Sequence, residues 1–233
     1  MLRLLAPTPP VAGTIEITGA ELRHFHTLRL GVGDRLLVFD TDGTEHLSIV
    51  TGVSTRAATV RVEQTNTVTR ESALEIVLAP ALLKGRKLDL VIEKATELGV
   101  PRFAPFVSAH SIGERDHRER WERIALAASK QSGRTRVPIV EAARSFDALV
   151  AAPWRGLRLL AWEEEPAQHV GALPADATGV LLVIGPEGGF APAEVATART
   201  RDFLSITLGP RVLRAETAAI VATTLAQHRW GDL

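Results

Sequence analysis

Short runs of apolar residues, separated by turn-forming residues, predict that the first part of the chain is rich in β-strands. Two of these runs, residues 45–53 and 58–63, are rich in β-branched residues, which favour strands. A turn signal that ends in glycine, Thr41-Asp42-Gly43, follows one of the runs. Many short strands in so few residues are typical of a small β-barrel. The expected strands are residues 2–5, 14–17, 35–40, 45–53 and 58–63.

One helix is expected inside this β-rich part. Leu22, Phe25 and Leu28 recur at near-helical intervals, and Thr18 and Glu21 have the spacing of a capping box. We expect Phe25 to be buried in the barrel rather than to stack on a nucleotide base.

Beyond Leu74 the pattern changes to strand-like apolar runs that alternate with helical periodicity. Such alternation predicts an α/β domain whose mostly parallel sheet is covered by helices on both faces. The polar residues 64–72 lack periodicity, so we place the domain boundary there, with a first domain over 1–68 and a second over 73–233. The expected strands are residues 74–79, 102–107, 157–161, 180–184 and 203–208, and the expected helices are 88–98, 117–131, a short one capped by Ser145, 192–201 and 216–229.

The composition narrows the class of protein. Lysine plus arginine and aspartate plus glutamate number 27 each among 233 residues, which disfavours a non-specific polyanion binder but leaves room for a local basic patch that binds RNA. The chain has no cysteine, which excludes disulfides, thiolate metal sites and a cysteine nucleophile. No segment has the length of a membrane span or the character of a signal peptide, so we expect a cytoplasmic protein that binds no membrane.

Two glycine- and proline-rich loops follow predicted strands near the C-terminus. Residues 180–184 run into Gly185-Pro186-Glu187-Gly188-Gly189-Phe190, and residues 203–208 run into Gly209-Pro210-Arg211-Val212-Leu213-Arg214. In open parallel sheets, ligands bind beyond the carboxyl ends of strands, and glycines let the backbone approach a ligand closely. Neither loop has the spacing of a P-loop or a dinucleotide fingerprint. The residues alone indicate a small-molecule site with backbone contacts, with the alternative that each loop is only a turn.

Several motifs along the chain resemble those of one enzyme family. They are IGPEGGF at 184–190 and LGPRVLRAETA at 208–218, together with HFHTLRLGVGD at 24–34, KGRK at 84–87, KATELGV at 94–100, QSGR at 131–134 and VP at 137–138. These motifs resemble RNA methyltransferases of the SPOUT class and, more closely, the ribosomal RNA small subunit methyltransferase E family, which methylates N3 of a uridine in 16S ribosomal RNA. The resemblance spans nearly the whole chain.

The resemblance implies a PUA-like β-barrel followed by an α/β SPOUT domain with a deep trefoil knot, a topology that is very rare in proteins. It also implies a homodimer that uses S-adenosyl-L-methionine. The implied partner is 16S ribosomal RNA, in an assembled or partly assembled small subunit. On the matching positions, the cofactor-binding residues would be Ile184, Gly185, Pro186, Glu187, Gly188, Leu208, Gly209, Pro210, Val212 and Leu213.

The chemistry of N3 methylation points to two further residues as catalytic. Uracil N3 is a poor nucleophile until it loses its proton, so the site needs a base or a group that stabilises the uracil anion. Arg214 could stabilise that anion or bind phosphate, and Glu216 could accept the proton or orient Arg214. The alternative is a surface ion pair at the start of a helix, where Glu216 suits the helix dipole.

Basic and polar residues in the matching motifs are candidates for contacts with RNA, with ordinary surface solvation as the alternative. Two stretches depart from the family. The spacing between the histidines and the LR pair near His24 and His26 is shorter than in some relatives, so either histidine could correspond to the family histidine. Ser108-Ala109-His110-Ser111 stands where relatives carry an acid and an arginine between two serines, so either His110 would hold RNA less firmly or another residue would hold it. The acidic run 163–165 is expected to be exposed and unrelated to RNA. The RNA-contact candidates are His24, Arg29, Lys84, Arg86, Lys87, Gln131 and Arg134.

Three other functions are alternatives to this interpretation. A SPOUT ribose 2′-O or transfer-RNA methyltransferase would share the catalytic domain, but the N-terminal barrel and its LRL–GVGD stretch argue against it. A non-enzymatic ribosomal RNA assembly factor would use the barrel alone, but the intact GPEGG and LGPRVLR loops argue against a decayed cofactor site. A nucleotide-dependent α/β enzyme is disfavoured because the phosphate-binding motifs are missing.

Overall fold

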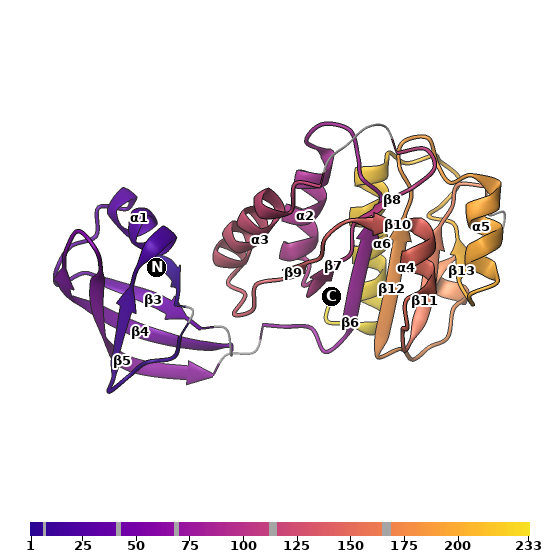
Figure 1. Ribbon diagram of the computed structural model, residues 1–233. Coiled ribbons are helices and arrows are strands. Elements are labelled where there is room, and N and C mark those ends of the chain that lie inside the picture. The colour runs from indigo at the N-terminus through magenta and orange to yellow at the C-terminus, as the bar shows by residue number, and fades with distance from the viewer. Residues whose placement is uncertain (7, 41–42, 68–69, 112–115, 165–168) are drawn as a thin grey trace. The chain divides into compact units, whose positions relative to one another are not determined.

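The computed structural model describes residues 1–6, 8–40, 43–67, 70–111, 116–164 and 169–233, and the expected turn residues Thr41 and Asp42 lie outside these ranges. The chain forms two compact units (Figure 1). The first unit comprises Met1–Glu71 and Ser129–Val137, and the second comprises Ser72–Ala128 and Pro138–Leu233. The first unit is therefore discontinuous in sequence. The predicted single boundary between residues 68 and 73 assigned residues 129–137 to the second domain, whereas they belong to the first unit.

The first unit is built on a five-stranded sheet with the strand order β1-β3-β4-β5-β2. β1 pairs with β3 in parallel, and the other neighbours are antiparallel. The five strands predicted from the sequence are present, and the last one continues into the stretch predicted as a linker, where Thr67 pairs with Thr44. The polar composition of that stretch therefore reflects exposed positions of a strand. The elements are β1 (Arg3–Leu5), β2 (Thr14–Ile17), α1 (Gly19–Thr27), β3 (Arg35–Phe39), β4 (Thr44–Val53) and β5 (Ala58–Thr67).

Helix α1 packs its apolar side against this sheet. Leu22 and Phe25 are buried, as predicted, in a core that also contains Leu4, Leu36 and Val60. Phe25 is fully buried, so it belongs to the core and offers no stacking surface to a base.

The predicted capping box of α1 is wrong. Thr18 is the N-cap residue, but its side chain makes no capping hydrogen bond. The carboxylate of Glu21 instead accepts a hydrogen bond from the backbone N–H of Leu5 at 3.2 Å and two from Nζ of Lys130 at 2.6 and 2.7 Å. A long-range ion pair within the first unit thus takes the carboxylate that the local pattern assigned to the helix start.

Residues 129–137 are joined to the rest of the first unit by partly buried polar contacts. Nε and Nη2 of Arg134 donate hydrogen bonds to Oε2 of Glu71 at 3.0 and 2.5 Å. The other carboxylate oxygen of Glu71 accepts from the backbone N–H groups of Thr135 and Arg136, both at 3.1 Å. Both carboxylate oxygens of Glu71 therefore accept hydrogen bonds, which offsets the cost of removing this charge from water.

The second unit has a six-stranded sheet with the order β13-β11-β12-β6-β7-β9, in which each pair is parallel. This confirms the predicted α/β class with a mostly parallel sheet. The strands of the second unit are β6 (Glu75–Pro80), β7 (Arg102–Phe103), β8 (Phe106–Val107), β9 (Ile139–Val140), β10 (Arg144–Ser145), β11 (Leu157–Ala161), β12 (Gly179–Ile184) and β13 (Leu204–Ile206). β8 and β10 form a separate two-stranded sheet. Its helices are α2 (Lys87–Glu97), α3 (Arg118–Ser132, which extends into the first unit), α4 (Phe146–Ala151), η1 (Val170–Ala172), α5 (Pro192–Arg199) and α6 (Ala215–Trp230).

The strand predicted over residues 102–107 is divided in two. β7 ends before Ala104 and Pro105, and β8 pairs with β10 outside the main sheet. Proline has no N–H to donate to a strand ladder, which explains the break. The predicted N-cap of the next helix is confirmed, since Oγ of Ser145 accepts from the backbone N–H of Ala148 at 3.2 Å.

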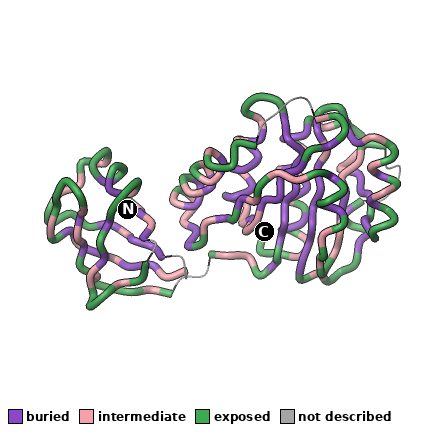
Figure 2. The backbone as a smooth tube through the Cα atoms, viewed as in Figure 1, coloured by how far each residue is buried: buried purple, intermediate pink, exposed green. Residues whose placement is uncertain are grey.

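Helices cover both faces of this sheet. β12 is buried along its whole length, and Leu181 and Val183 pack in one core with Phe146 of α4 and Val195 of α5. Helix α6 packs on β12 and on α2, behind the sheet in Figure 1. Figure 2 shows the central strands buried between these layers. None of the helices in the described part of the chain is both long and apolar enough to span a membrane.

Candidate active site

Three strands of the second unit end at one edge of its sheet. Ala161 at the end of β11 is in register with Ile184 at the end of β12 and with Ile206 at the end of β13. The loops that follow these strands enclose two cavities of about 250 Å³ and about 50 Å³, which share lining residues. This is the edge at which the sequence predicts a ligand, because ligands bind beyond the carboxyl ends of parallel strands.

Most of the residues predicted to bind the cofactor line these two cavities. Gly188 and Pro210 line neither of them. The other predicted residues divide between the larger cavity, with Ile184, Gly185, Pro186, Glu187, Val212 and Leu213, and the smaller one, with Leu208, Gly209 and again Leu213.

The loop after β12 is a tight turn packed on the core. The backbone N–H of Gly189 donates to the carbonyl of Pro186 at 3.0 Å, and Gly189 has a φ of +68°, which favours glycine. A Cβ on Gly185 would come within 3.0 Å of the Phe190 ring. That ring packs against Phe106 in the core. The glycines therefore let the backbone pass between the core and the cavity.

His110 holds this loop from outside. Its Nδ1 lies 3.0 Å from the carbonyl oxygen of Gly188 and 3.2 Å from that of Gly189. Carbonyl oxygens only accept, so Nδ1 carries the proton and donates. Glu194 in turn fixes the segment that carries His110, because its carboxylate accepts from Oγ of Ser108 at 3.0 Å and from the backbone N–H of Ala109 at 3.0 Å. The structure thus gives His110 a role in shaping the cavity loop, where the sequence predicted a weak RNA contact.

The loop after β13 is turned by a hydroxyl group. Oγ1 of Thr207 donates to the carbonyl of Gly209 at 3.2 Å and accepts from its N–H at 3.3 Å. Gly209 has a φ of +115°, a conformation that side chains with a Cβ rarely adopt. Beyond it, Val212 is exposed although it lines the larger cavity. This places an apolar side chain at the open side of the site.

Lys87 and Glu187 form an ion pair beside the larger cavity. Nζ of Lys87 donates to Oε1 of Glu187 at 2.7 Å, and the backbone N–H of Lys84 donates to the same oxygen at 3.2 Å. The hydrogen bond to Glu187 raises the pKa of Lys87 above its ordinary value, and the charges of Glu187 and Glu216 add to the rise. Partial burial acts to raise the pKa of Glu187, but the hydrogen bonds from Lys87 and from backbone N–H groups outweigh it and lower that pKa overall. Lys87 therefore holds the cavity loop, in addition to any role toward phosphate.

The two predicted catalytic residues lie at the start of α6. Arg214 is the N-cap residue and lines the larger cavity. Glu216, in the first helical turn, is only 9% exposed, and its Oε2 has no hydrogen-bond partner among the described residues. Both charges act on the pKa of Lys87, since that of Glu216 raises it and that of Arg214 lowers it. Because Glu216 is buried, it is not one half of an exposed surface ion pair.

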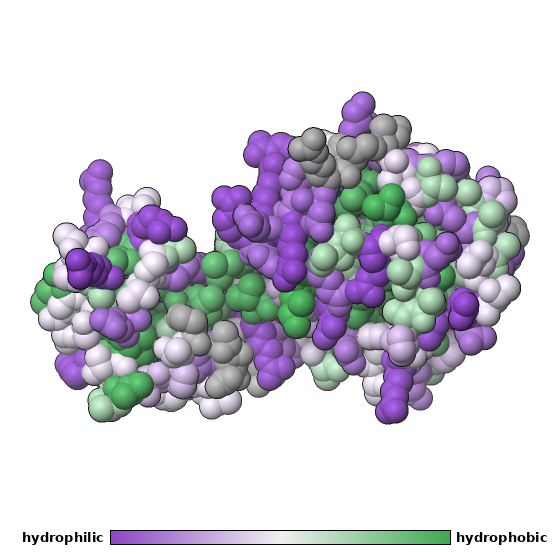
Figure 3. All heavy atoms as spheres, viewed as in Figure 1, coloured by the Kyte–Doolittle hydropathy of each residue, from purple (hydrophilic) through white to green (hydrophobic). Residues whose placement is uncertain are grey.

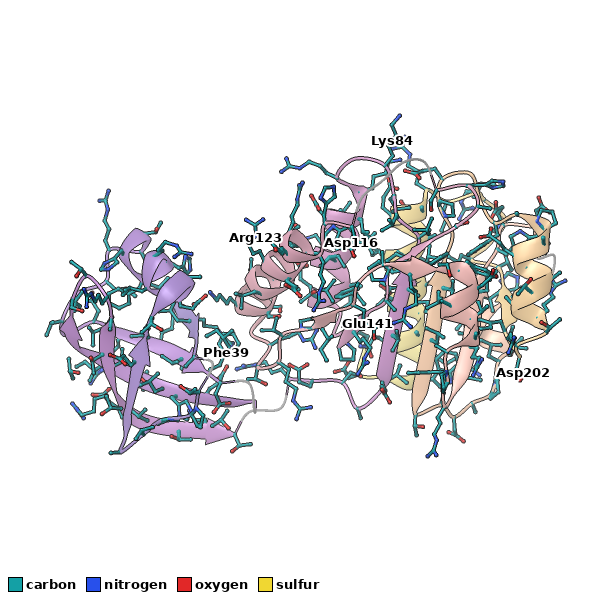
Figure 4. The ribbon with its side chains drawn as sticks, viewed as in Figure 1. Phe39, Lys84, Asp116, Arg123, Glu141 and Asp202 are labelled. Carbon is teal, nitrogen blue, oxygen red and sulfur yellow. The ribbon has the colours of Figure 1, made fainter. Side chains whose placement is uncertain are left out.

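The residues predicted to contact RNA fall into two groups. Lys84 and Arg86 are exposed beside the site, and Figure 4 shows the Lys84 side chain projecting outward. His24, Arg29 and Gln131 are exposed in the first unit. These five side chains are open to a partner.

Arg134 differs from these candidates. Its side chain is 3% exposed and is paired with Glu71. The prediction that it contacts phosphate is therefore contradicted, because the local sequence did not reveal its distant carboxylate partner.

Helix α3 also carries charged residues, and they behave as a solvated face. Arg118 pairs with Glu122, and Arg120 pairs with Asp89 of α2. Figure 3 shows hydrophilic side chains gathered over α2 and α3. Two arginines of this helix are thus paired with acids, as the interspersed charge pattern indicates, and Nε of Arg123 donates to the backbone carbonyl of Glu119 at 3.2 Å.

Sequence reasoning missed three cavity residues that follow or end β11. Ala161 and Glu163 line both cavities, and Trp162 lines the smaller one. The acidic run at 163–165 was predicted to be exposed, and Glu163 and Glu164 are, while Glu165 lies outside the described residues. The sequence does predict β11 as an apolar strand of the same parallel sheet, which could have pointed to these residues. Its position between β12 and β13, however, cannot be predicted from the order of the strands along the chain.

Comparison with known proteins agrees with this arrangement. Residues 17–63 match the family described as RNA methyltransferase PUA domain, and residues 70–227 match the family described as RNA methyltransferase domain. The ribosomal RNA small subunit methyltransferase E of Bacillus subtilis is 34% identical over 94% of this chain and 91% of its own length. The chain belongs to the ribosomal RNA small subunit methyltransferase E family. The member from Synechocystis is 32% identical over 94% of this chain and 74% of its own length.

Solved structures of this family and of related methyltransferases have the same fold. The ribosomal RNA small subunit methyltransferase E from Neisseria gonorrhoeae, bound to S-adenosyl methionine, has a TM-score of 0.93 at 29% identity and covers 100% of this chain and 99% of its own. A methyltransferase from Legionella pneumophila, also in complex with this cofactor, has a TM-score of 0.93 at 31% identity over the same shares of the two chains. The fold of the present chain is therefore the PUA-like and SPOUT combination of the ribosomal RNA small subunit methyltransferase E family.

Proposed function

We propose that this protein transfers a methyl group from S-adenosyl-L-methionine to N3 of a uridine in the 16S ribosomal RNA of the small subunit. Family membership supports ribosomal RNA as the substrate and this cofactor as the methyl donor. The observation that carries the assignment to this site is the cavity between the two glycine-rich loops, with Arg214 in its lining and the unpartnered carboxylate oxygen of Glu216 nearby.

The residues at this edge of the sheet fit the cofactor. Ile184, Leu213 and Ala218 offer apolar surface for a flat adenine ring, and Gly185 exposes backbone groups that can bond its edge. The cavity of about 250 Å³ is close to the lower end of the range for small-molecule sites, about 300–1,000 Å³. When bound, S-adenosyl-L-methionine supplies an electrophilic methyl group on its sulfonium.

The chain's own residues would align and activate the base. Arg214, at the cavity wall, would hold the anionic form of uracil or the adjacent phosphate. Glu216 would accept the N3 proton directly or orient Arg214, since a buried carboxylate oxygen without a partner is otherwise costly to keep. Holding two reactants in line contributes up to about 7–11 kcal/mol to such a displacement.

The RNA would be held by exposed basic and polar side chains. N3 lies on the Watson–Crick edge, so the target uridine has to be unpaired or flipped out. Lys84 and Arg86 beside the cavity are proposed to bind phosphate, with His24, Arg29 and Gln131 adding contacts from the first unit. We further propose, by family membership, a trefoil-knotted cofactor domain, a cytoplasmic homodimer, and an assembled or partly assembled subunit as the substrate.

The reaction is tested by deleting the gene and measuring modified nucleosides of 16S ribosomal RNA by mass spectrometry. The expected result is loss of 3-methyluridine, and its return with the wild-type gene but not with a gene that encodes Arg214→Ala. Incubation of the purified protein with naked 16S RNA and with small subunits from the deletion strain then separates the two substrates. Loss of a different methylated nucleoside would overturn the N3 assignment, and no change in any methylated nucleoside would favour a non-enzymatic assembly factor.

A further inference from the structure

We propose that Glu163 binds the ribose hydroxyl groups of the cofactor and helps to determine which ligands this site accepts. The proposal deepens the proposed function and rests on it. Glu163 lies outside both glycine-rich motifs, in the segment that follows β11. Three observations carry the inference: its place between the cavities, the space made for it by a glycine, and its free charge.

The place of Glu163 follows from the strand order. β11 lies between β12 and β13, so the segment after Ala161 runs between the two loops that enclose the site. Glu163 accordingly lines both the larger and the smaller cavity. A ligand that extends through both cavities has its middle portion beside the residues that both cavities share, which are Ala161, Glu163, Leu213 and Ala218. In S-adenosyl-L-methionine the middle portion is the ribose, with adenine on one side and the methionine arm on the other.

A glycine of the neighbouring loop makes room for this carboxylate. A Cβ built on Gly189 would lie 2.3 Å from Oε1 of Glu163, well inside any allowed contact. Gly189 also has a φ of +68°, so both its conformation and its lack of a side chain suit this position. The carboxylate of Glu163 is therefore packed directly against the cavity loop and has a defined position.

The charge of Glu163 is available to a ligand. Of the three acids at the site, Glu187 is bonded to Lys87, and Glu216 does not line either cavity. Among the described residues, the side chain of Glu163 has neither a hydrogen bond nor an ion pair. An ionised carboxylate only accepts hydrogen bonds, and two neighbouring hydroxyl groups can donate to its two oxygens. Acidic residues bind ribose hydroxyls in the same way in dinucleotide sites.

The proposal is tested by calorimetric titration of the full-length protein with two ligands. S-adenosylhomocysteine contains the ribose and the amino-acid arm, whereas 5′-methylthioadenosine contains the ribose but lacks the amino-acid arm and its α-amino group. Glu163→Ala is expected to weaken the binding of both ligands by about 10- to 100-fold, as for loss of hydrogen bonds to a charged group. Glu164→Ala, an exposed neighbour, is the matched control and should bind both ligands like the wild type.

The outcomes separate the possible roles of Glu163. Weaker binding of S-adenosylhomocysteine alone would overturn the ribose contact and assign the carboxylate to the α-amino group of the amino-acid arm. Unchanged binding of both ligands would overturn any contact with the cofactor. If the wild-type protein itself binds neither ligand, the proposal that this site binds S-adenosyl-L-methionine is overturned. That outcome concerns the proposed function and not the role of Glu163 in particular. Thermal unfolding of each variant shows whether a loss of binding comes from misfolding.

Discussion

The ammonium group of Lys87 lies 2.7 Å from Oε1 of Glu187, so the first residue of α2 is bonded to the cavity loop that follows β12. The pKa of Glu187 is lowered below 4.5. The ion pair therefore stabilises the folded protein fully above pH 4.5, and this stabilisation is lost as the pH falls through the folded-state pKa of Glu187. The pKa of Lys87 is raised above 10.5. The stabilisation from its charge is therefore present below pH 10.5 and is lost as the pH rises through the folded-state pKa of Lys87. The contact is thus charged on both sides throughout the neutral range.

Removal of either partner is expected to loosen the cavity loop. Lys87→Met and Glu187→Gln should each weaken cofactor binding at neutral pH, and the double variant should be no weaker than the poorer single variant, because both changes break the same bond. The coupling should vanish well below pH 4.5, where Glu187 is protonated. Titration of the wild type, the two single variants and the double variant with S-adenosylhomocysteine measures this coupling free energy. Fully additive losses at neutral pH would show that the two side chains act separately.

Glu216→Gln is expected to slow methyl transfer without weakening cofactor binding. The carboxylate is buried, unpartnered among the described residues and outside the cavity lining, so the change removes a proton acceptor and leaves the cofactor contacts intact. Loss of general base catalysis reduces kcat by about 10²- to 10⁴-fold. Single-turnover rates and cofactor affinity are measured side by side, with Thr217→Ala, an exposed neighbour, as the control. A raised KM for the cofactor with an unchanged kcat would contradict the catalytic role.

His110→Ala is expected to weaken cofactor binding by about 5- to 10-fold, the effect of losing one hydrogen bond worth about 1 kcal/mol. The imidazole touches carbonyl groups of Gly188 and Gly189, so its effect should reach the cofactor through the shape of the loop. His110→Asn keeps a donor and should restore part of the affinity. His26→Ala, an exposed histidine of the first unit, should have no effect on the cofactor. If His110→Ala weakened RNA binding alone, the direct RNA contact would be the better explanation.

Arg134→Ala is expected to destabilise the first unit by about 3–5 kcal/mol, because it leaves the carboxylate of Glu71, which is only 14% exposed, without its guanidinium partner. Arg136→Ala removes an exposed charge nearby and should cost less than about 0.5 kcal/mol. All four tryptophans lie in the second unit, so hydrogen exchange of β4 and β5 is the suitable measurement. Unchanged exchange together with weaker RNA binding would restore Arg134 as a phosphate contact.

Features set by local sequence were predictable, and features set by distant partners were not. The apolar run of β12, the glycines of the loop after it and the Ser145 cap depend on neighbouring residues, and each was found from its pattern. Glu21 looked like part of a capping box because its partner Lys130 is 109 residues away. Glu163 looked like an ordinary surface acid because its place depends on which strands flank β11. Strand order and ion-pair partners belong to the tertiary fold, which periodicity does not contain.

The discontinuity of the first unit has a consequence for protein synthesis. Glu71 leaves the ribosome 63 residues before Arg134, the side chain that neutralises it. At about 5–20 residues per second, that interval lasts on the order of 3–13 seconds. Until it ends, the nascent N-terminal unit lacks the segment 129–137 and carries an uncompensated carboxylate at the place where that segment docks. Completion of the N-terminal unit is thus an event of the second half of translation.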